Sequence, residues 1–149
     1  LSPARCVVSF PTTHMRFTHP HDLLRHVGAE LGVSNWLTID QARVHAFARI
    51  SAAPESQWIH GYLLLSLFPR LTTECLDIGQ VRRTLNYGLD RIRFEAPVSI
   101  GARVRLRQTI RAAEAAKSGG IRLTLDGVLE VEHSDGPAVI GQAIRIVYP

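Results

Sequence analysis

The stretch that decides the fold is residues 57–68, which read Gln57-Trp58-Ile59-His60-Gly61-Tyr62-Leu63-Leu64-Leu65-Ser66-Leu67-Phe68. From Tyr62 to Phe68 only Ser66 is polar, and so short an apolar run cannot span a bilayer, which needs about 20 residues. Apolar residues on every side are typical of an element that is covered on all sides, and the many leucines favour a helix over a strand. We therefore expect a buried helix that begins at Gly61.

The start of this helix is a candidate for chemistry. The first turn of a helix leaves backbone N–H groups unpaired and carries partial positive charge, which suits an oxygen that becomes negative during a reaction. His60 stands directly before this turn. The alternative is a plain core helix preceded by a histidine on the surface.

The composition is that of one globular domain, with 46% hydrophobic and 20% charged residues in a chain of 149. The net charge of +4 permits an anionic partner but is too small to indicate nucleic-acid binding. The sequence has no stretch typical of a transmembrane helix, so we expect no membrane partner. Cys6 and Cys75 form neither a metal-binding spacing nor a disulfide framework, which favours a cytoplasmic location. Because the only methionine is Met15, residues 1–14 are expected either to precede the natural start or to follow a removed tag. We expect residues 1–17 to be an N-terminal extension and residues 18–149 to be the domain.

Before residue 57 the sequence predicts three short elements. These are a helix over residues 20–28, a strand over residues 32–39 and a helix over residues 41–50 with Asp40 as its N-cap. Gly28 suits the left-handed position that ends the first of them.

The histidines outside residues 57–68 do not predict a metal site. His19, His21 and His26 surround the first helix, but no cysteine or tight carboxylate cluster accompanies them, so we expect them to be exposed. His45 lies beside the apolar face of the helix over residues 41–50 and is interpreted as structural.

The second half of the chain predicts four long strands separated by turn signals. Arg103, Arg105 and Arg107 alternate with apolar residues, which is the period of a half-buried strand. The four strands are expected over residues 81–96, 102–114, 121–133 and 138–148. Helices followed by hairpin-linked strands indicate an α+β fold, and we expect its antiparallel sheet to wrap around the apolar helix.

Four motifs follow one another along the chain: Gln57-Trp58-Ile59-His60, His60-Gly61-Tyr62-Leu63, Asn86-Tyr87-Gly88-Leu89, and Arg93-Phe94 followed by Pro97-Val98 and Gly101. In this order they resemble the MaoC-like dehydratases, which include R-specific enoyl-CoA hydratases, and within them the branch called nodulation protein N. The resemblance runs from about Val27 to Tyr148 and implies the hotdog fold.

The resemblance implies hydration of trans-2-enoyl-CoA to (R)-3-hydroxyacyl-CoA, or the reverse dehydration. The family places an aspartate and a histidine five positions apart, and together they hold the reacting water. His60 matches the histidine, but Glu55 stands where the family has aspartate. Glutamate can do the same proton chemistry, although misplacing a carboxylate by about 1 Å can cost about 100-fold in rate. The alternative for Glu55 is an exposed loop carboxylate.

The resemblance also implies the remaining parts of the site. The Gly61 N–H is expected in the oxyanion hole, and Asn86, Tyr87 and Arg93 are candidate substrate-binding residues. The substrate would be a coenzyme A thioester, no cofactor or metal is expected, and the protein should be a homodimer. The arginines of this region, Arg82, Arg83, Arg91 and Arg93, either meet the coenzyme A phosphates or are solvated.

One departure from the family decides between functions. The family normally has a further segment between the two motifs that meet here at His60 and Gly61. Either this segment is deleted or the printed sequence omits it, and we expect an omission, with a chain break between these residues. If they are joined directly, the active-site cover is lost, and acyl-CoA or acyl-carrier binding without efficient hydratase activity is favoured. A thioesterase is the third possibility.

Overall fold

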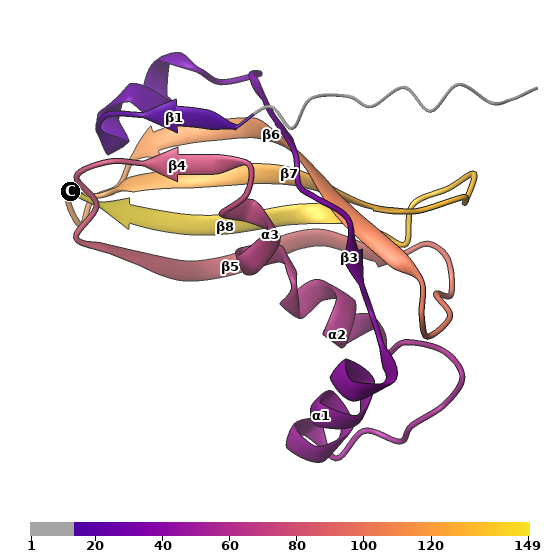
Figure 1. Cartoon of the computed structure of the whole chain (residues 1–149). Coiled ribbons are helices and arrows are strands. Elements are labelled where there is room, and N and C mark those ends of the chain that lie inside the picture. Colours follow the sequence, from indigo (N-terminus) through magenta and orange to yellow (C-terminus); the bar gives the residue numbers. More distant parts are fainter. Residues whose placement is uncertain (1–13) are drawn as a thin grey trace, which may run out of the picture.

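The computed structural model describes residues 14–149 and consists of a curved antiparallel sheet with helices against one face (Figure 1). The strand order is β2-β6-β7-β8-β5, and β3 also pairs with β6. The strands are β2 (Glu30–Val33), β3 (Leu37–Thr38), β5 (Arg83–Phe94), β6 (Arg103–Ala115), β7 (Ile121–Val131) and β8 (Val139–Tyr148). The four long strands predicted from the sequence are confirmed as β5 to β8, and they form the α+β architecture that was expected.

The alternation in β6 places its side chains as predicted. Val104 and Leu106 are fully buried, whereas the arginines between and beside them point to the other face of the sheet. There Arg105 and Arg107 both donate hydrogen bonds to Glu130 on β7, at 2.6 and 2.8 Å. One face of the sheet is therefore free to cover the helices.

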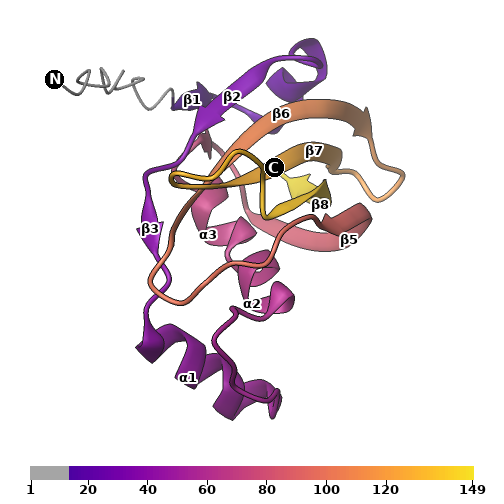
Figure 2. The same ribbon diagram turned by 90° about the vertical axis from the view of Figure 1, so that its right-hand side faces the viewer.

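The predicted central helix is confirmed as α2 (Gly61–Ser66) followed by α3 (Phe68–Thr72), which has proline in its first turn. Figure 2 looks along the strands and shows the sheet curving around these helices. Leu63, Leu64 and Phe68 are buried against the sheet. The expectation that this helix is covered on all sides was nevertheless wrong. The sheet covers one side only, and Tyr62 is 63% exposed.

The helix α1 (Gln41–Ser51) lies beyond the end of the sheet (Figures 1 and 2). Its predicted cap is confirmed, since Asp40 Oδ1 accepts a hydrogen bond of 2.9 Å from the Arg43 N–H. Val44 is its one buried residue. The helix ends at Ala52, whose left-handed conformation (φ 55°) turns the chain back toward α2.

A small parallel pair of strands, one N-terminal and one following α3, was not revealed by the sequence. β1 (Met15–Phe17) pairs in parallel with β4 (Leu76–Ile78), and Phe17 packs in the core. β1 belongs to the stretch that was expected to be an extension, and the rest of that stretch, with Cys6, lies outside the described residues. Between β1 and β2 the predicted helix is a 3₁₀ helix, η1 (Pro20–Arg25), and Gly28 is left-handed as expected (φ 89°).

The strand expected over residues 32–39 is interrupted. Ser34 is buried and its hydroxyl accepts a hydrogen bond from the Leu106 N–H at 2.9 Å. A side chain thus takes the place that a backbone carbonyl would occupy in a continuous ladder, which separates β2 from β3.

Candidate active site

His60 is the N-cap of α2. Its ring Nδ1 accepts a hydrogen bond of 3.1 Å from the Tyr62 N–H, and its carbonyl oxygen accepts one of 2.9 Å from the Leu63 N–H. The expected chain break between His60 and Gly61 is therefore wrong, because the residue that ends the loop also begins the helix. Since Nδ1 is an acceptor, the neutral ring carries its proton on Nε2, which remains available as a donor.

A small cavity between α1 and α2 brings the two predicted catalytic residues together. Glu55 and His60 both line it, with Phe47, Trp58 and Leu63 among the apolar residues of its wall. It leaves about 10 Å³ for the centre of a water-sized molecule, which is about what one water needs. Two polar side chains are the minimum that an ordered water requires, so the cavity suits a single bound water.

The carboxylate of Glu55 also has a partner that the sequence interpretation missed. Its Oε1 lies 3.2 Å from Nδ1 of His45 on α1, and both side chains are exposed. The left-handed Ala52 makes this contact possible by turning the loop back along the helix. Alanine is not a typical residue for that conformation, so no signal in the sequence predicted the approach.

A row of aromatic rings continues from the cavity along the outer side of α2. The ring centroids are 5.4 Å apart for Phe47 and His60, 5.5 Å for His60 and Tyr62, and 5.9 Å for Tyr62 and Phe94. The Phe94 ring covers Gly61 so closely that an added Cβ would lie 2.7 Å from it, which explains the glycine. Within the described part of the chain, the Gly61 N–H has no hydrogen-bond partner.

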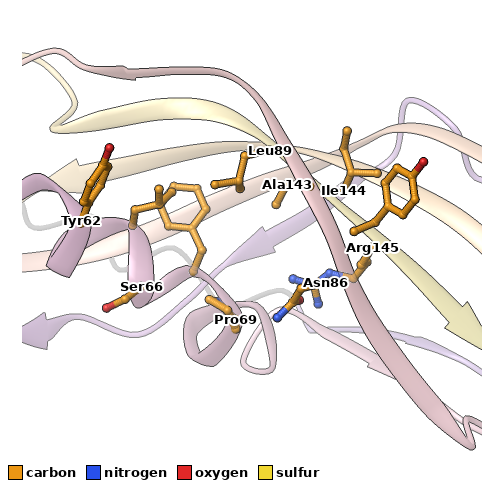
Figure 3. A pocket seen from close by; sticks show the side chains of 12 residues that line it. Tyr62, Ser66, Pro69, Asn86, Leu89, Ala143, Ile144 and Arg145 are labelled. Carbon is orange, nitrogen blue, oxygen red and sulfur yellow. The ribbon is translucent and has the colours of Figure 1, made fainter. Parts of the chain in front are cut away.

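Beside Tyr62 in this row lies a larger pocket of about 370 Å³ between the helices and strands β5 and β8 (Figure 3). Its walls are mostly apolar, with Leu65 and Phe68 from the helical side and Leu89 from β5. Tyr62 lies between this pocket and His60. The size and lining are typical of a small-molecule site.

The structure separates the three candidate substrate-binding residues. Asn86 and Tyr87 line the larger pocket. Arg93 does not, and its exposed Nη1 lies 4.0 Å from Glu95 Oε1. Of the other arginines considered for phosphate binding, all are exposed, and Arg83 lies over the Tyr148 ring at 4.3 Å.

One further residue of this pocket was missed. Arg145 of β8 lines the pocket beside Asn86, its register partner on β5. Burial lowers the pKa of the Arg145 guanidinium. The signal was available, because Arg145 has the same position in the strand alternation as Ala143 and Val147, which are buried.

Two further kinds of feature, metal-ligand clusters and membrane-spanning helices, are absent from the described residues. Within residues 14–149, no three His, Cys, Asp or Glu side chains are placed to hold a metal ion. No helix in the same range is long and apolar enough to cross a membrane.

Comparison with known proteins shows the family. The chain is 34% identical over 140 residues to 3-hydroxyacyl-thioester dehydratase Z of Mycobacterium tuberculosis, covering 83% of this chain and 91% of the relative. It is 32% identical over 143 residues to nodulation protein N of Rhizobium leguminosarum bv. viciae, covering 85% and 89%. Both alignments are longer than the part of this chain that they cover, so the relatives carry residues that this chain lacks.

The fold has solved counterparts. The MaoC-like dehydratase of Rhodospirillum rubrum superposes with a TM-score of 0.65 at 16% identity, over 82% of this chain and 92% of that one. No family model matches the chain. The fold and the sequence relatives agree with each other, and the chain belongs to the MaoC-like family of hotdog-fold hydratases and dehydratases, in the branch of 3-hydroxyacyl-thioester dehydratase Z and nodulation protein N.

Proposed function

We propose that this protein hydrates trans-2-enoyl thioesters to (R)-3-hydroxyacyl thioesters, or dehydrates them in reverse, with coenzyme A or an acyl carrier as the thiol. The observation that carries the proposal is the shared cavity of Glu55 and His60, which has room for one water. The sequence similarity to a 3-hydroxyacyl-thioester dehydratase supports it.

In this proposal the two side chains have different tasks. The Nε2–H of His60 donates a hydrogen bond to the water and holds it, because Nδ1 is already engaged by the Tyr62 N–H. The Glu55 carboxylate takes a proton from that water as its oxygen bonds to C3 of the substrate. The electron pair of the C2–C3 double bond moves toward the thioester, and protonated Glu55 then returns the proton to C2. One water is added, and both residues end as they began.

The charge that develops on the thioester oxygen needs a donor. The family resemblance assigns the Gly61 N–H as the donor to the thioester oxygen. Among the described residues this N–H has no hydrogen-bond partner. Its place next to His60 in the chain keeps the donor close to the water. The acyl chain would then pass Tyr62 into the larger pocket, whose apolar walls suit hydrocarbon.

His45 is proposed to position the base. A hydrogen bond to one carboxylate oxygen fixes the orientation of Glu55 and leaves the other oxygen free for the water. This contact compensates for the longer side chain of glutamate, whose carboxylate has more freedom than that of aspartate.

We also propose that the protein is a cytoplasmic homodimer. β5 is an edge strand, and within the described residues its outer backbone groups have no partner strand. Its exposed apolar residues are Leu85, Tyr87, Leu89 and Phe94. Edges of this length are usually paired or protected, and a second copy would cover β5 and stand beside the larger pocket. The free, buried Cys75 fits a reducing compartment.

The second candidate is acyl-thioester binding without efficient hydration. The direct joining of His60 to Gly61 favours it, because a cover that would exclude water is then missing, and His60 is exposed. An assay decides between the two: hydration of crotonyl-CoA and longer trans-2-enoyl-CoA esters, followed by the loss of absorbance of the conjugated thioester. Hydration supports the enzyme, whereas tight binding of the thioester without loss of absorbance supports the binding protein.

A further inference from the structure

Arg145 is a cation on the side of the sheet that faces the helices. In β8 it alternates with Ala143 and Val147, which are buried, and its neighbour across β7 is the fully buried Leu123. Arginine rarely occupies such a position unless it is paired, because a charge removed from water is costly. The position therefore requires an explanation.

No acid of the described chain neutralises Arg145. It forms no ion pair with an aspartate or glutamate of residues 14–149, and its buried Nε has no hydrogen-bond partner there. The guanidinium borders the larger pocket on one side and a cavity of about 160 Å³ on the other, and no aspartate or glutamate lines either of them. A half-buried guanidinium whose buried Nε has no partner, beside an apolar pocket, is suited to an anion that enters through the pocket.

The pocket has different chemistry at its two ends. Tyr62 lies at one end and leads to His60, while Asn86 and Arg145 lie together at the other (Figure 3). Leu89 lies three residues from Asn86 along β5, a span of roughly 10 Å at about 3.3 Å per residue. A ligand that fills this space has an apolar middle and an anionic far end.

We propose that the pocket selects acyl thioesters whose chain ends in a carboxylate, with Arg145 binding that carboxylate and Asn86 donating to it. This rests on the proposed function, because it places the thioester beside His60 and the far end of the acyl chain at Arg145. A carboxylate matches the planar fork of the guanidinium, and a medium-length hydrocarbon matches the walls. The phosphates of coenzyme A fit this pocket poorly, since they are strongly hydrated and its walls are apolar.

Binding of saturated thioesters tests the site without any chemistry. Calorimetry on the full chain compares suberyl-CoA, which ends in a carboxylate, with octanoyl-CoA, which has the same length and ends in a methyl group. The wild type should bind suberyl-CoA more tightly by about tenfold or more, the scale of a hydrogen-bonded charge pair. Arg145→Gln should abolish the preference, Arg145→Lys should keep part of it, and the exposed Arg83→Gln, outside the pocket, should leave it unchanged.

Hydration of the matching unsaturated esters, 2-octenedioyl-CoA and 2-octenoyl-CoA, separates this inference from the proposed function. If neither ester is hydrated but the suberyl preference depends on Arg145, the anion site stands and the proposed function fails. If octenoyl-CoA is hydrated and the wild type binds octanoyl-CoA as tightly as suberyl-CoA, the function stands and the anion site is wrong. A preference that survives Arg145→Gln in a folded variant also overturns it, and an acid of a second copy would then be the partner of Arg145.

Discussion

Glu55 contacts His45, with 3.2 Å between Oε1 and Nδ1, while its carboxylate also lines the water-sized cavity that it shares with His60. The base of the proposed reaction is thus held from the side of α1, and the water is held from the side of α2. The loop that joins the two helices sets the distance between them.

If His45 positions Glu55, its removal should slow turnover without weakening substrate binding. We expect His45→Ala to lower kcat by about 10- to 100-fold with little change in KM, because a misplaced base loses rate on this scale. His45→Gln retains a donor and should recover part of the loss. Equal kcat for the wild type and His45→Ala would show that the contact only fixes the loop.

Glu55 itself is tested by two substitutions. Glu55→Gln keeps the shape and loses the proton transfer, so kcat should fall by about 10² to 10⁴-fold. Glu55→Asp restores the residue that the family resemblance implies, and it should retain more activity than Glu55→Gln. If Glu55→Gln is as active as the wild type on the same enoyl-CoA, another group is the base.

The proposed dimer gives a mutational test. Leu89 is an exposed apolar residue of the edge strand β5, and Leu89→Lys would place a charge in the interface. Light scattering at micromolar concentration should show a dimer for the wild type and a monomer for this variant. Ile50→Lys, at an 88% exposed position on α1, is the matched control and should remain dimeric. A monomeric wild type contradicts the proposal.

Acid should weaken the outer face of the sheet, because Glu130 there accepts hydrogen bonds from Arg105 and Arg107 as a carboxylate. Burial raises the pKa of this carboxyl, but the hydrogen bonds and charges of Arg107 and Arg105 outweigh it and hold the pKa below the usual 4.5. A carboxyl with a lowered folded-state pKa contributes stability above the unfolded value, and the contribution is lost as the pH falls through the folded value.

Urea unfolding at pH 7 and at a pH low enough to protonate Glu130 in the folded protein measures this contribution. Glu130→Gln should lose about 1–2 kcal/mol at pH 7, where one partner of a charged pair is removed, and little at the lower pH. Glu114→Gln, an exposed position on β6, should differ from the wild type at neither pH. An equal loss for Glu130→Gln at both values would contradict the assignment.

The sequence predicted the elements whose periodicity is local. The four long strands, the central helix and the Asp40 cap could be recognised because alternation, apolar runs and caps each depend on a few neighbouring residues. β1 and β4 were not recognised, since three-residue strands carry no periodic signal and this pair joins residues about 60 positions apart. The break at Ser34 was missed for a similar reason, because it depends on a contact with Leu106.

The site was predictable only as far as motifs reach. Glu55 and His60 were assigned through the family resemblance, and both side chains line one cavity. His45 was missed because its role depends on a tertiary contact, which the left-handed Ala52 makes by turning the loop. Arg145 was missed although its position in the alternation of β8 places it on the same side as the buried Ala143 and Val147. The chain break expected between His60 and Gly61 was wrong, because His60 is joined to Gly61 and caps α2.

The most direct test of the central claim is the turnover of His60 variants on one trans-2-enoyl-CoA. His60→Ala loses both the donor to the water and the cap of α2, whereas His60→Asn keeps a good cap residue and changes the ring chemistry alone. We expect kcat to fall by about 10² to 10⁴-fold in both variants, with KM nearly unchanged and with His60→Asn folded as stably as the wild type. Turnover at the wild-type rate in a folded His60→Asn variant would show that His60 does not act on the reacting water.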